Sequence, residues 1–252
     1  CIRDRLEVAL ASVRACLHTL SEAGWQVDPS RVRAGAEAPE EEWRDAWKKY
    51  FHVTSLTRQI VVVPSWENYQ AKVNDIVIHL DPGQAFGTGA HASTQLVLET
   101  MQELSDGDLE APETIFDLGT GSGILAIAAA KFWPSTHVTA TDIDPLSISA
   151  TQENAAANGV GDRIAVSTMP LPQVEGQFPL VLANIQSHIL RDLRDDLLPR
   201  IAESGQLLVS GILSSQIQSL VDYYTEVAEL ELVSIKRSGL NPDWSSAHLR
   251  RC

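Results

Sequence analysis

From residue 114 to the carboxyl end, short apolar strands alternate with segments of helical periodicity. The pattern predicts strands at 114–118, 137–141, 163–168, 178–184, 206–210, 230–236 and 246–250, and helices at 123–132, 145–157, 187–202 and 214–228. Such alternation predicts an α/β fold with a doubly wound, mostly parallel sheet that binds ligands at the carboxyl ends of its strands. Segments 60–63 and 75–80, rich in Val and Ile, predict two further strands upstream.

A glycine-rich turn follows the strand at 114–118, with the sequence Asp117-Leu118-Gly119-Thr120-Gly121-Ser122-Gly123. Its glycines let the backbone approach a ligand, and the helix that follows offers free N–H groups. A phosphate-binding loop requires Gly-Lys-Ser/Thr here, but Ile124 follows Gly123. A dinucleotide fingerprint requires a sixth-position glycine, where Ile124 stands again. The remaining pattern is Asp-x-Gly-x-Gly-x-Gly.

That pattern resembles motif I of the class I S-adenosylmethionine-dependent methyltransferases. The acid at Asp117 suits a ligand that carries a cationic sulfonium and no phosphate. About 20 residues further on, Asp142 ends the next strand, where a carboxylate accepts hydrogen bonds from both ribose hydroxyls. Ile143 is expected against the adenine ring, and Asp144 is expected to cap the next helix. Asn184 ends a buried strand near the expected sulfonium, with an amide suited to orient a methyl acceptor.

A second resemblance is more specific. The run Asp81-Pro82-Gly83-Gln84-Ala85-Phe86-Gly87-Thr88-Gly89 is similar to the segment that precedes motif I in ribosomal protein L11 methyltransferases. The similarity spans roughly residues 40 to 236. It also includes Trp43, Trp47, Val63-Pro64-Ser65-Trp66, residues 154–160, Ala183-Asn184-Ile185 and Ser210-Gly211-Ile212-Leu213.

The resemblance implies a Rossmann-like, seven-stranded methyltransferase domain that methylates lysine and terminal amino groups of a ribosomal protein, with S-adenosylmethionine as cofactor. Thr94, Gly119, Asp142 and Asn184 would bind the cofactor, Asn184 would also orient the acceptor, and Phe86, Thr88 and His91 would line the site. Gly121 belongs to the same turn. This chain has Ala90-His91-Ala92-Ser93 where the family usually has Thr-His-Pro-Thr, and Gln186-Ser187-His188-Ile189 where small residues and a Pro are usual.

The first 40 residues differ in character from the rest. Apolar residues at helical spacing predict an amphipathic helix over 2–22, and the stretch 28–42, rich in Pro, Gly, Ala and charge, predicts a linker. We therefore expect residues 1–38 to form part of an amino-terminal recruiting domain with its linker, and residues 39–252 to form the methyltransferase domain. The opening Cys1-Ile2-Arg3-Asp4 lacks an initiator Met and a signal-peptide pattern, which indicates a fragment or a processed chain.

The net charge of −14 favours a basic protein partner and disfavours nucleic acid, although acidity also serves solubility alone. No apolar stretch approaches the length of a membrane span. Three separated cysteines indicate neither a metal site nor a disulfide framework, which favours a reducing, cytoplasmic setting.

Methyl transfer from a sulfonium requires alignment of donor and acceptor more than a catalytic triad. The histidines His91 and His188 are therefore expected to pack or to hydrogen-bond rather than to act as bases. Three alternatives stay open: a methyltransferase for another protein or a small molecule, a non-enzymatic scaffold, and, least favoured because of Ile124, a nicotinamide-dependent oxidoreductase.

Overall fold

The computed structural model of the 252-residue chain describes residues 10–11, 13–15, 17–18, 28, 30, 51–81, 91–107, 110–226 and 230–252. The chain divides into two compact units, Cys1–Tyr50 and Phe51–Cys252. In the first unit the described residues between 10 and 18 are helical, as expected for 2–22. The predicted boundary near residue 38 and the Trp43–Trp47 pair lie outside the described residues, and the recruiting role stays a prediction.

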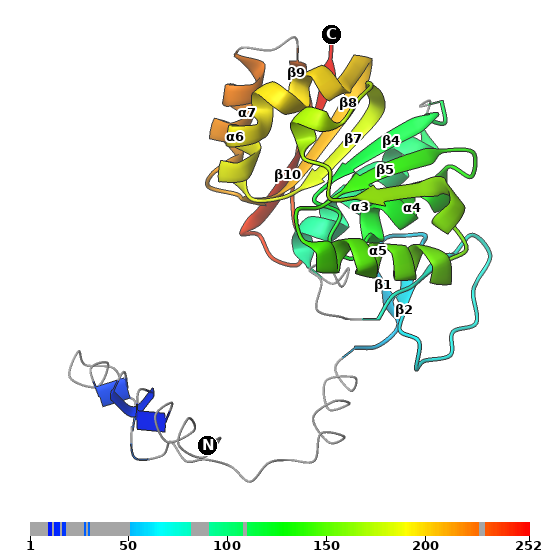
Figure 1. The fold of residues 1–252 in the computed structure, drawn as a ribbon. Helices are drawn as coiled ribbons and strands as arrows, with labels where there is room; N and C mark the ends of the chain where they lie inside the picture. Colours follow the sequence, from blue (N-terminus) through cyan, green and yellow to red (C-terminus); the bar gives the residue numbers. More distant parts are fainter. Residues whose placement is uncertain are drawn as a thin grey trace. The chain divides into compact units, whose positions relative to one another are not determined.

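A seven-stranded sheet forms the centre of the second unit, in the order β6-β5-β4-β7-β8-β10-β9 (Figure 1). Strand β10 runs antiparallel to β8 and β9, and the other neighbours are parallel. This is the predicted doubly wound, mostly parallel sheet. The strands are β4 (Thr114–Leu118), β5 (His137–Thr141), β6 (Ile164–Ser167), β7 (Phe178–Asn184), β8 (Ile201–Leu213), β9 (Leu230–Arg237) and β10 (Trp244–Arg251).

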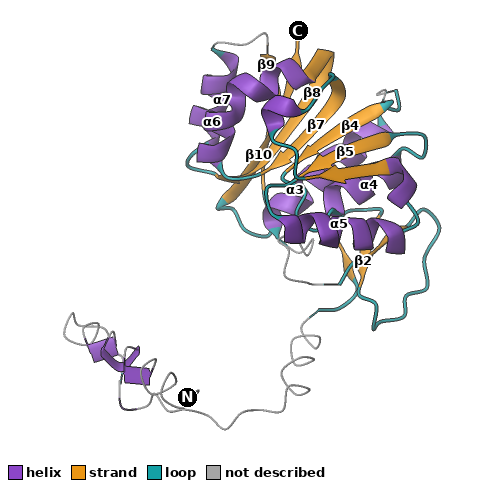
Figure 2. Ribbon diagram, viewed as in Figure 1, coloured by secondary structure: helices purple, strands orange, loops and turns teal. Residues whose placement is uncertain are grey.

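Helices cover both faces of the sheet (Figure 2). They are α3 (Ala92–Asp106), α4 (Ile124–Phe132), α5 (Pro145–Ala157), α6 (Ser187–Leu197) and α7 (Ile217–Thr225), with short 3₁₀ turns η3 (Gly161–Arg163), η4 (Leu171–Gln173) and η5 (Leu198–Arg200). Because strand order reverses between β4 and β7, the crevice at the carboxyl ends of these strands is the expected ligand site.

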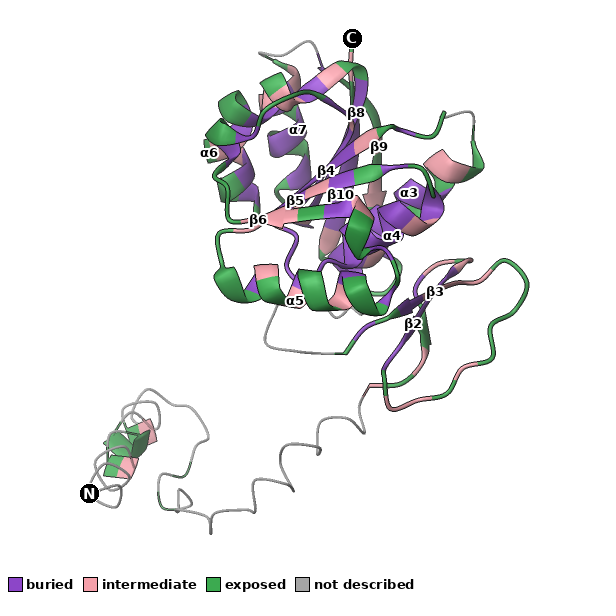
Figure 3. Cartoon of the chain, turned by 45° about the vertical axis from the view of Figure 1, so that its right-hand side comes forward, coloured by how far each residue is buried: buried purple, intermediate pink, exposed green. Residues whose placement is uncertain are grey.

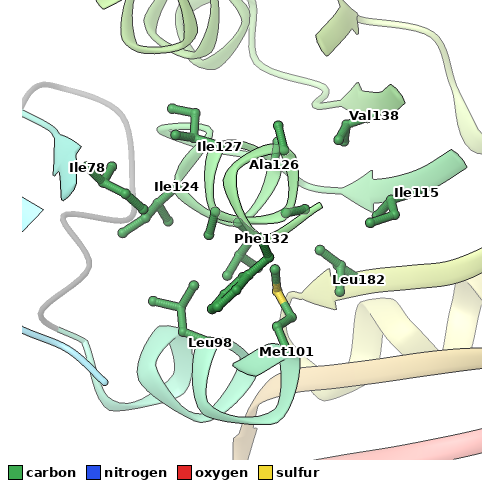
Figure 4. Close-up of a cluster of buried hydrophobic side chains, with 14 of the residues drawn as sticks. Ile78, Leu98, Met101, Ile115, Ile124, Ala126, Ile127, Phe132, Val138 and Leu182 are labelled. Carbon is green, nitrogen blue, oxygen red and sulfur yellow. The ribbon is translucent and has the colours of Figure 1, made fainter. Parts of the chain in front are cut away.

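Side chains of alternate strand residues belong to two separate apolar clusters, one on each face of the sheet. Ile115 and Leu182 pack with α3 and α4, whereas Phe116 and Val181 pack with α6 and α7. The buried strands and inner helix faces appear in purple in Figure 3, and Figure 4 shows Leu98 and Met101 of α3 beside Phe132 of α4. Burial of apolar surface on both sides fixes the strand register, since a one-residue slip exchanges the two faces.

A smaller three-stranded sheet consists of β1 (Thr54–Ser55), β2 (Ile60–Val63) and β3 (Ile76–His79). Strands β2 and β3 confirm the predictions for 60–63 and 75–80. Ile60 and Ile78 belong to the same apolar cluster as α4. Asn158 accepts from the His79 N–H at 2.9 Å and donates to its carbonyl at 2.7 Å, which fixes this sheet to the end of α5.

Three predictions about elements were wrong in extent, and one helix was missed. The helix expected over 187–202 ends at Leu197, because Pro199 supplies no N–H to continue the ladder, and Ile201 already begins β8. Strand β8 is longer than 206–210 because it pairs with both β7 and β10. Helix α7 covers only 217–225 of the expected 214–228, with residues 227–229 outside the description. Helix α3 was not predicted at all.

Candidate functional site

The glycine turn after β4 has the geometry of a ligand-binding loop. Gly119, Gly121 and Gly123 have φ of 75°, 57° and 82°, in the left-handed region that favours glycine. A Cβ on Gly119 would lie 2.6 Å from Ile185 Cγ2, and one on Gly123 would lie 2.8 Å from Thr151 Cγ2. Side chains are therefore excluded at both ends of the turn by conformation and by space.

Neighbouring strands hold the turn in place. The N–H groups of Gly119 and Thr120 donate to the Thr141 carbonyl at 2.8 and 3.0 Å, at the end of β5. On the other side, Thr151 Oγ1 donates to the Gly121 carbonyl at 3.0 Å, and Asn154 Nδ2 donates to the Ser122 carbonyl at 2.8 Å. This supporting role of Thr151 was not predicted from the sequence. It follows from the position of Thr151 on the buried face of α5.

Asp142 lies at the carboxyl end of β5, next to the turn as predicted. One carboxylate oxygen accepts from the Gly121 N–H at 2.9 Å, and the other accepts from the Asp144 N–H at 3.0 Å. Each oxygen keeps a lone pair for another donor. The following Ile143 is 93% exposed, and Asp144 caps α5 by accepting from the Leu146 N–H at 2.9 Å, which confirms the predicted cap.

Asp117 is completely buried at the base of the turn. Loss of solvent raises its pKa to about 7, against the lowering effect of hydrogen bonds from the Thr120 hydroxyl and the Ala126 N–H. The Thr120 hydroxyl donates to Asp117 at 2.7 Å. Asp117 therefore supports the turn from inside.

A closed set of contacts surrounds Asn184 at the end of β7. Asn184 Nδ2 donates to Thr94 Oγ1 at 3.2 Å, which links β7 to α3. In the next strand, Ser210 is the register partner of Asn184, and its hydroxyl donates to the Ser93 carbonyl at 2.9 Å. Asn184 Oδ1 has no hydrogen-bond partner within the described part of the chain. The structure thus brings together Thr94 and Asn184, two residues that the sequence had singled out separately, and adds Ser210.

Gly211 borders the same amide. A Cβ on Gly211 would lie 3.1 Å from Asn184 Oδ1 and 3.0 Å from the Ile185 carbonyl, and its φ of 77° again favours glycine. Because Gly211 has no side chain, nothing at this position crowds the Asn184 amide.

His91 is the N-cap residue of α3, whose first helical residue is Ala92. Its Nδ1 accepts from the Ser93 N–H at 3.3 Å, and its ring meets Trp244 edge-on with centroids 4.7 Å apart. The expectation of a packing and hydrogen-bonding histidine is confirmed. His188 is exposed in the first turn of α6. Phe86 and Thr88 lie outside the described residues, so their placement stays a prediction.

Two further features concern the described residues alone. No grouping of three or more His, Cys, Asp or Glu side chains that would suit a metal ion occurs among them. Within the same residues, no helix has the length and apolar character needed to cross a membrane.

Comparison with known proteins relates this geometry to a family. The family model described as ribosomal protein L11 methyltransferase (PrmA) matches residues 7–251. The ribosomal protein L11 methyltransferase of Geotalea daltonii is 39% identical over 216 residues, covering 83% of this chain and 67% of the relative. That of Geobacter metallireducens is 37% identical over 243 residues, covering 96% and 77%.

A solved structure supports the same family. The crystal structure of a ribosomal protein L11 methylase from Lactobacillus delbrueckii subsp. bulgaricus superimposes with a TM-score of 0.70 at 38% identity, covering 80% of this chain and 100% of that one. The family model extends over residues 7–251 and therefore includes the strands that carry the site. This chain belongs to the ribosomal protein L11 methyltransferase family.

Proposed function

We propose that this chain transfers the methyl group of S-adenosylmethionine to lysine and terminal amino groups of ribosomal protein L11. The observation that carries the proposal is the family match over residues 7–251, which includes the glycine turn, Asp142 and Asn184. The same residues form the candidate site at the strand-order reversal. A scaffold protein has no need of this combination of turn, acid and amide.

The residues at the carboxyl ends of β4 and β5 fit the cofactor. The glycine turn permits close backbone approach, the free lone pairs of Asp142 suit two ribose hydroxyls, and exposed Ile143 offers an apolar surface to a base. We assign Gly119, Gly121, Asp142, Ile143 and Thr94 to cofactor binding. Asp117 contributes from within the turn, and we retain Phe86, Thr88 and His91 as residues that line the site.

When bound, S-adenosylmethionine supplies an electrophilic methyl group on a sulfonium. That methyl group would go to an uncharged acceptor nitrogen, and the proton released from the methylated amine would go to solvent. The protein therefore mainly aligns the two reactants and excludes water. We assign acceptor orientation to Asn184, whose buried Oδ1 has no hydrogen-bond partner among the described residues and so keeps its capacity to accept.

The substrate class also agrees with electrostatics. A net charge of −14 attracts a basic protein and repels nucleic-acid phosphates. We accordingly propose a basic protein partner without direct nucleic-acid binding, acting in the cytoplasm where ribosomal proteins are made.

The test is methylation of purified L11 with labelled S-adenosylmethionine, followed by mass spectrometry of the modified residues. We expect label on lysine or amino-terminal nitrogens, and loss of most of it with the Asn184→Ala variant. A parallel incubation with a cell extract identifies any other acceptor. Label that enters a different protein or a small molecule, with none in L11, would refute the substrate assignment while preserving the enzyme class.

A further inference from the structure

A hollow lies beside the first turns of α3, outside the site described above. It has a volume of about 460 Å³ and is formed by β1, by one face of α3 and by the turn between β9 and β10. Its apolar lining includes Leu56, Leu96 and Leu240, and its polar lining includes Gln95, Ser238 and Glu99. Leu240 is 71% exposed at the rim. We name this hollow the α3 groove.

The face of α3 that lines the groove continues as a row of carboxylates. Ala92, Leu96, Glu99, Glu103 and Asp106 are spaced by three or four residues, so they lie along one stripe of the helix. Ala92, Leu96 and Glu99 border the groove, whereas Glu103 and Asp106 lie beyond it.

Basic side chains from the flanking elements already pair with two of these acids. Lys236 of β9 contacts Glu103 at 2.5 Å, and Arg58, just before β2, pairs with Asp106. In the described part of the chain, the Glu99 carboxylate has no ion pair and accepts no hydrogen bond. The stripe therefore binds long cationic side chains at two positions and offers a third carboxylate inside a groove.

The lining suits the shape of such a side chain. Lysine and arginine lay an aliphatic stem along apolar surface and place a charged head in a polar environment. Leu96 and Leu240 provide the apolar surface, and Glu99 provides the carboxylate for the head.

The groove is connected to the candidate site through short contacts. Ala92 at the groove lies two residues before Thr94, which contacts Asn184. On the other side, the Ser238 N–H donates to the Trp244 carbonyl at 3.0 Å, and the Trp244 ring packs against His91 at the start of α3. The groove therefore lies close to Asn184. A protein substrate that places one amine at Asn184 can contact the groove with another part of its surface.

We propose that the α3 groove is a docking site for a lysine or arginine side chain of the protein substrate, distinct from the residue that is methylated. This inference rests on the proposed function, because it assigns part of the substrate surface to a second contact. The acidity of the chain supports a basic occupant. The groove selects protein substrates over isolated amines, because only a folded or extended partner reaches both sites.

The experiment compares Glu99→Lys and Glu99→Gln with Glu153→Lys, an equal charge reversal at an exposed position of α5. Steady-state methylation of purified L11 gives KM and kcat, and calorimetry gives the affinity for S-adenosylmethionine. We expect Glu99→Lys to raise KM for L11 about three- to tenfold and Glu99→Gln to raise it less, with kcat and cofactor affinity unchanged. A short lysine peptide too small to reach the groove should show the same KM with all variants.

The outcomes distinguish failure of the docking proposal from failure of the proposed function. If wild-type protein methylates L11 and Glu99→Lys changes KM no more than Glu153→Lys, the groove is not a docking site and the proposed function stands. A rise in KM for the short peptide as well would show a general charge effect and overturn the proposal. If wild-type protein binds the cofactor but leaves L11 unmodified, the proposed function fails and the docking site fails with it.

Discussion

Asp142 combines two roles in one side chain. Its carboxylate accepts from the backbone N–H groups of Gly121 and Asp144, and we propose that its remaining lone pairs accept from the ribose hydroxyls. The Asp142→Ala variant should weaken S-adenosylmethionine binding by about 1 to 3 kcal/mol, because charge-assisted hydrogen bonds are lost. Calorimetry measures the affinity, and thermal unfolding of the same samples reports damage to the turn. Unchanged affinity would remove Asp142 from the cofactor site.

We expect Ser210 to act on the site through its neighbours. Its side chain is fully buried, and its hydroxyl joins β8 to the start of α3, where Thr94 meets Asn184. Ser210→Ala should lower kcat about fivefold to tenfold through loss of one buried hydrogen bond, with a smaller change in KM for L11. Ser210→Thr, which keeps the hydroxyl, serves as the conservative control.

A double-mutant cycle distinguishes this positioning role from general loss of structure. In an Asn184→Ala background, Ser210→Ala should have little further effect on kcat, because the two residues act as a unit. Multiplicative effects of the two substitutions would show that Ser210 does not act through Asn184.

Among the elements, β10 carries a titratable group inside the sheet. His248 shares a 2.6 Å hydrogen bond with Gln206 of β8. Burial, followed by the positive charges of Lys236 and Arg250, lowers the pKa of His248 from 6.5 to about 4. Between pH 6.5 and pH 4 the unfolded chain binds a proton at His248 that the folded chain does not bind. The contribution of neutral His248 to stability is therefore complete above pH 6.5 and is lost as the pH falls toward 4.

The His248→Gln variant tests this dependence, because glutamine keeps a polar contact but does not titrate. Between pH 7 and pH 4 the free energy of unfolding of wild-type protein should fall by about 1 to 3 kcal/mol more than that of the variant. Urea denaturation at several pH values measures both, and the other ionisable groups cancel in the difference. Parallel curves would contradict the assignment.

Helix α3 shows where element prediction failed. Leu96, Val97, Met101 and Leu104 follow helical spacing, and His91 caps the start, so the signal was present in the sequence. The family motif Asp81–Gly89 ends just before this helix and does not predict it. By contrast, β4, β5, β7 and α5 have the predicted bounds, because each is a strong apolar or helical pattern flanked by glycine, proline or a cap.

On the scale of the whole molecule, Phe51–Cys252 contains both apolar clusters. We expect residues 51–252, produced alone, to unfold cooperatively and to bind S-adenosylmethionine within about twofold of the 252-residue chain. If residues 1–38 help to recruit substrate, the shorter protein should show a raised KM for L11 with similar kcat. Circular dichroism, calorimetry and steady-state kinetics check the three statements, and an equal KM would contradict the recruiting role.

The sequence by itself determined the doubly wound sheet, the glycine turn, and the positions of Asp142 and Asn184 at the carboxyl ends of their strands. These features follow from local patterns, since apolar periodicity, glycine and caps act over a few residues. Only the tertiary structure decided that Thr94 meets Asn184, that Ser210 reaches Ser93, and that Glu99 lies in a groove while Glu103 and Asp106 are paired. Those contacts join segments far apart in the chain, and they depend on how α3 packs against the sheet, which no local pattern specifies.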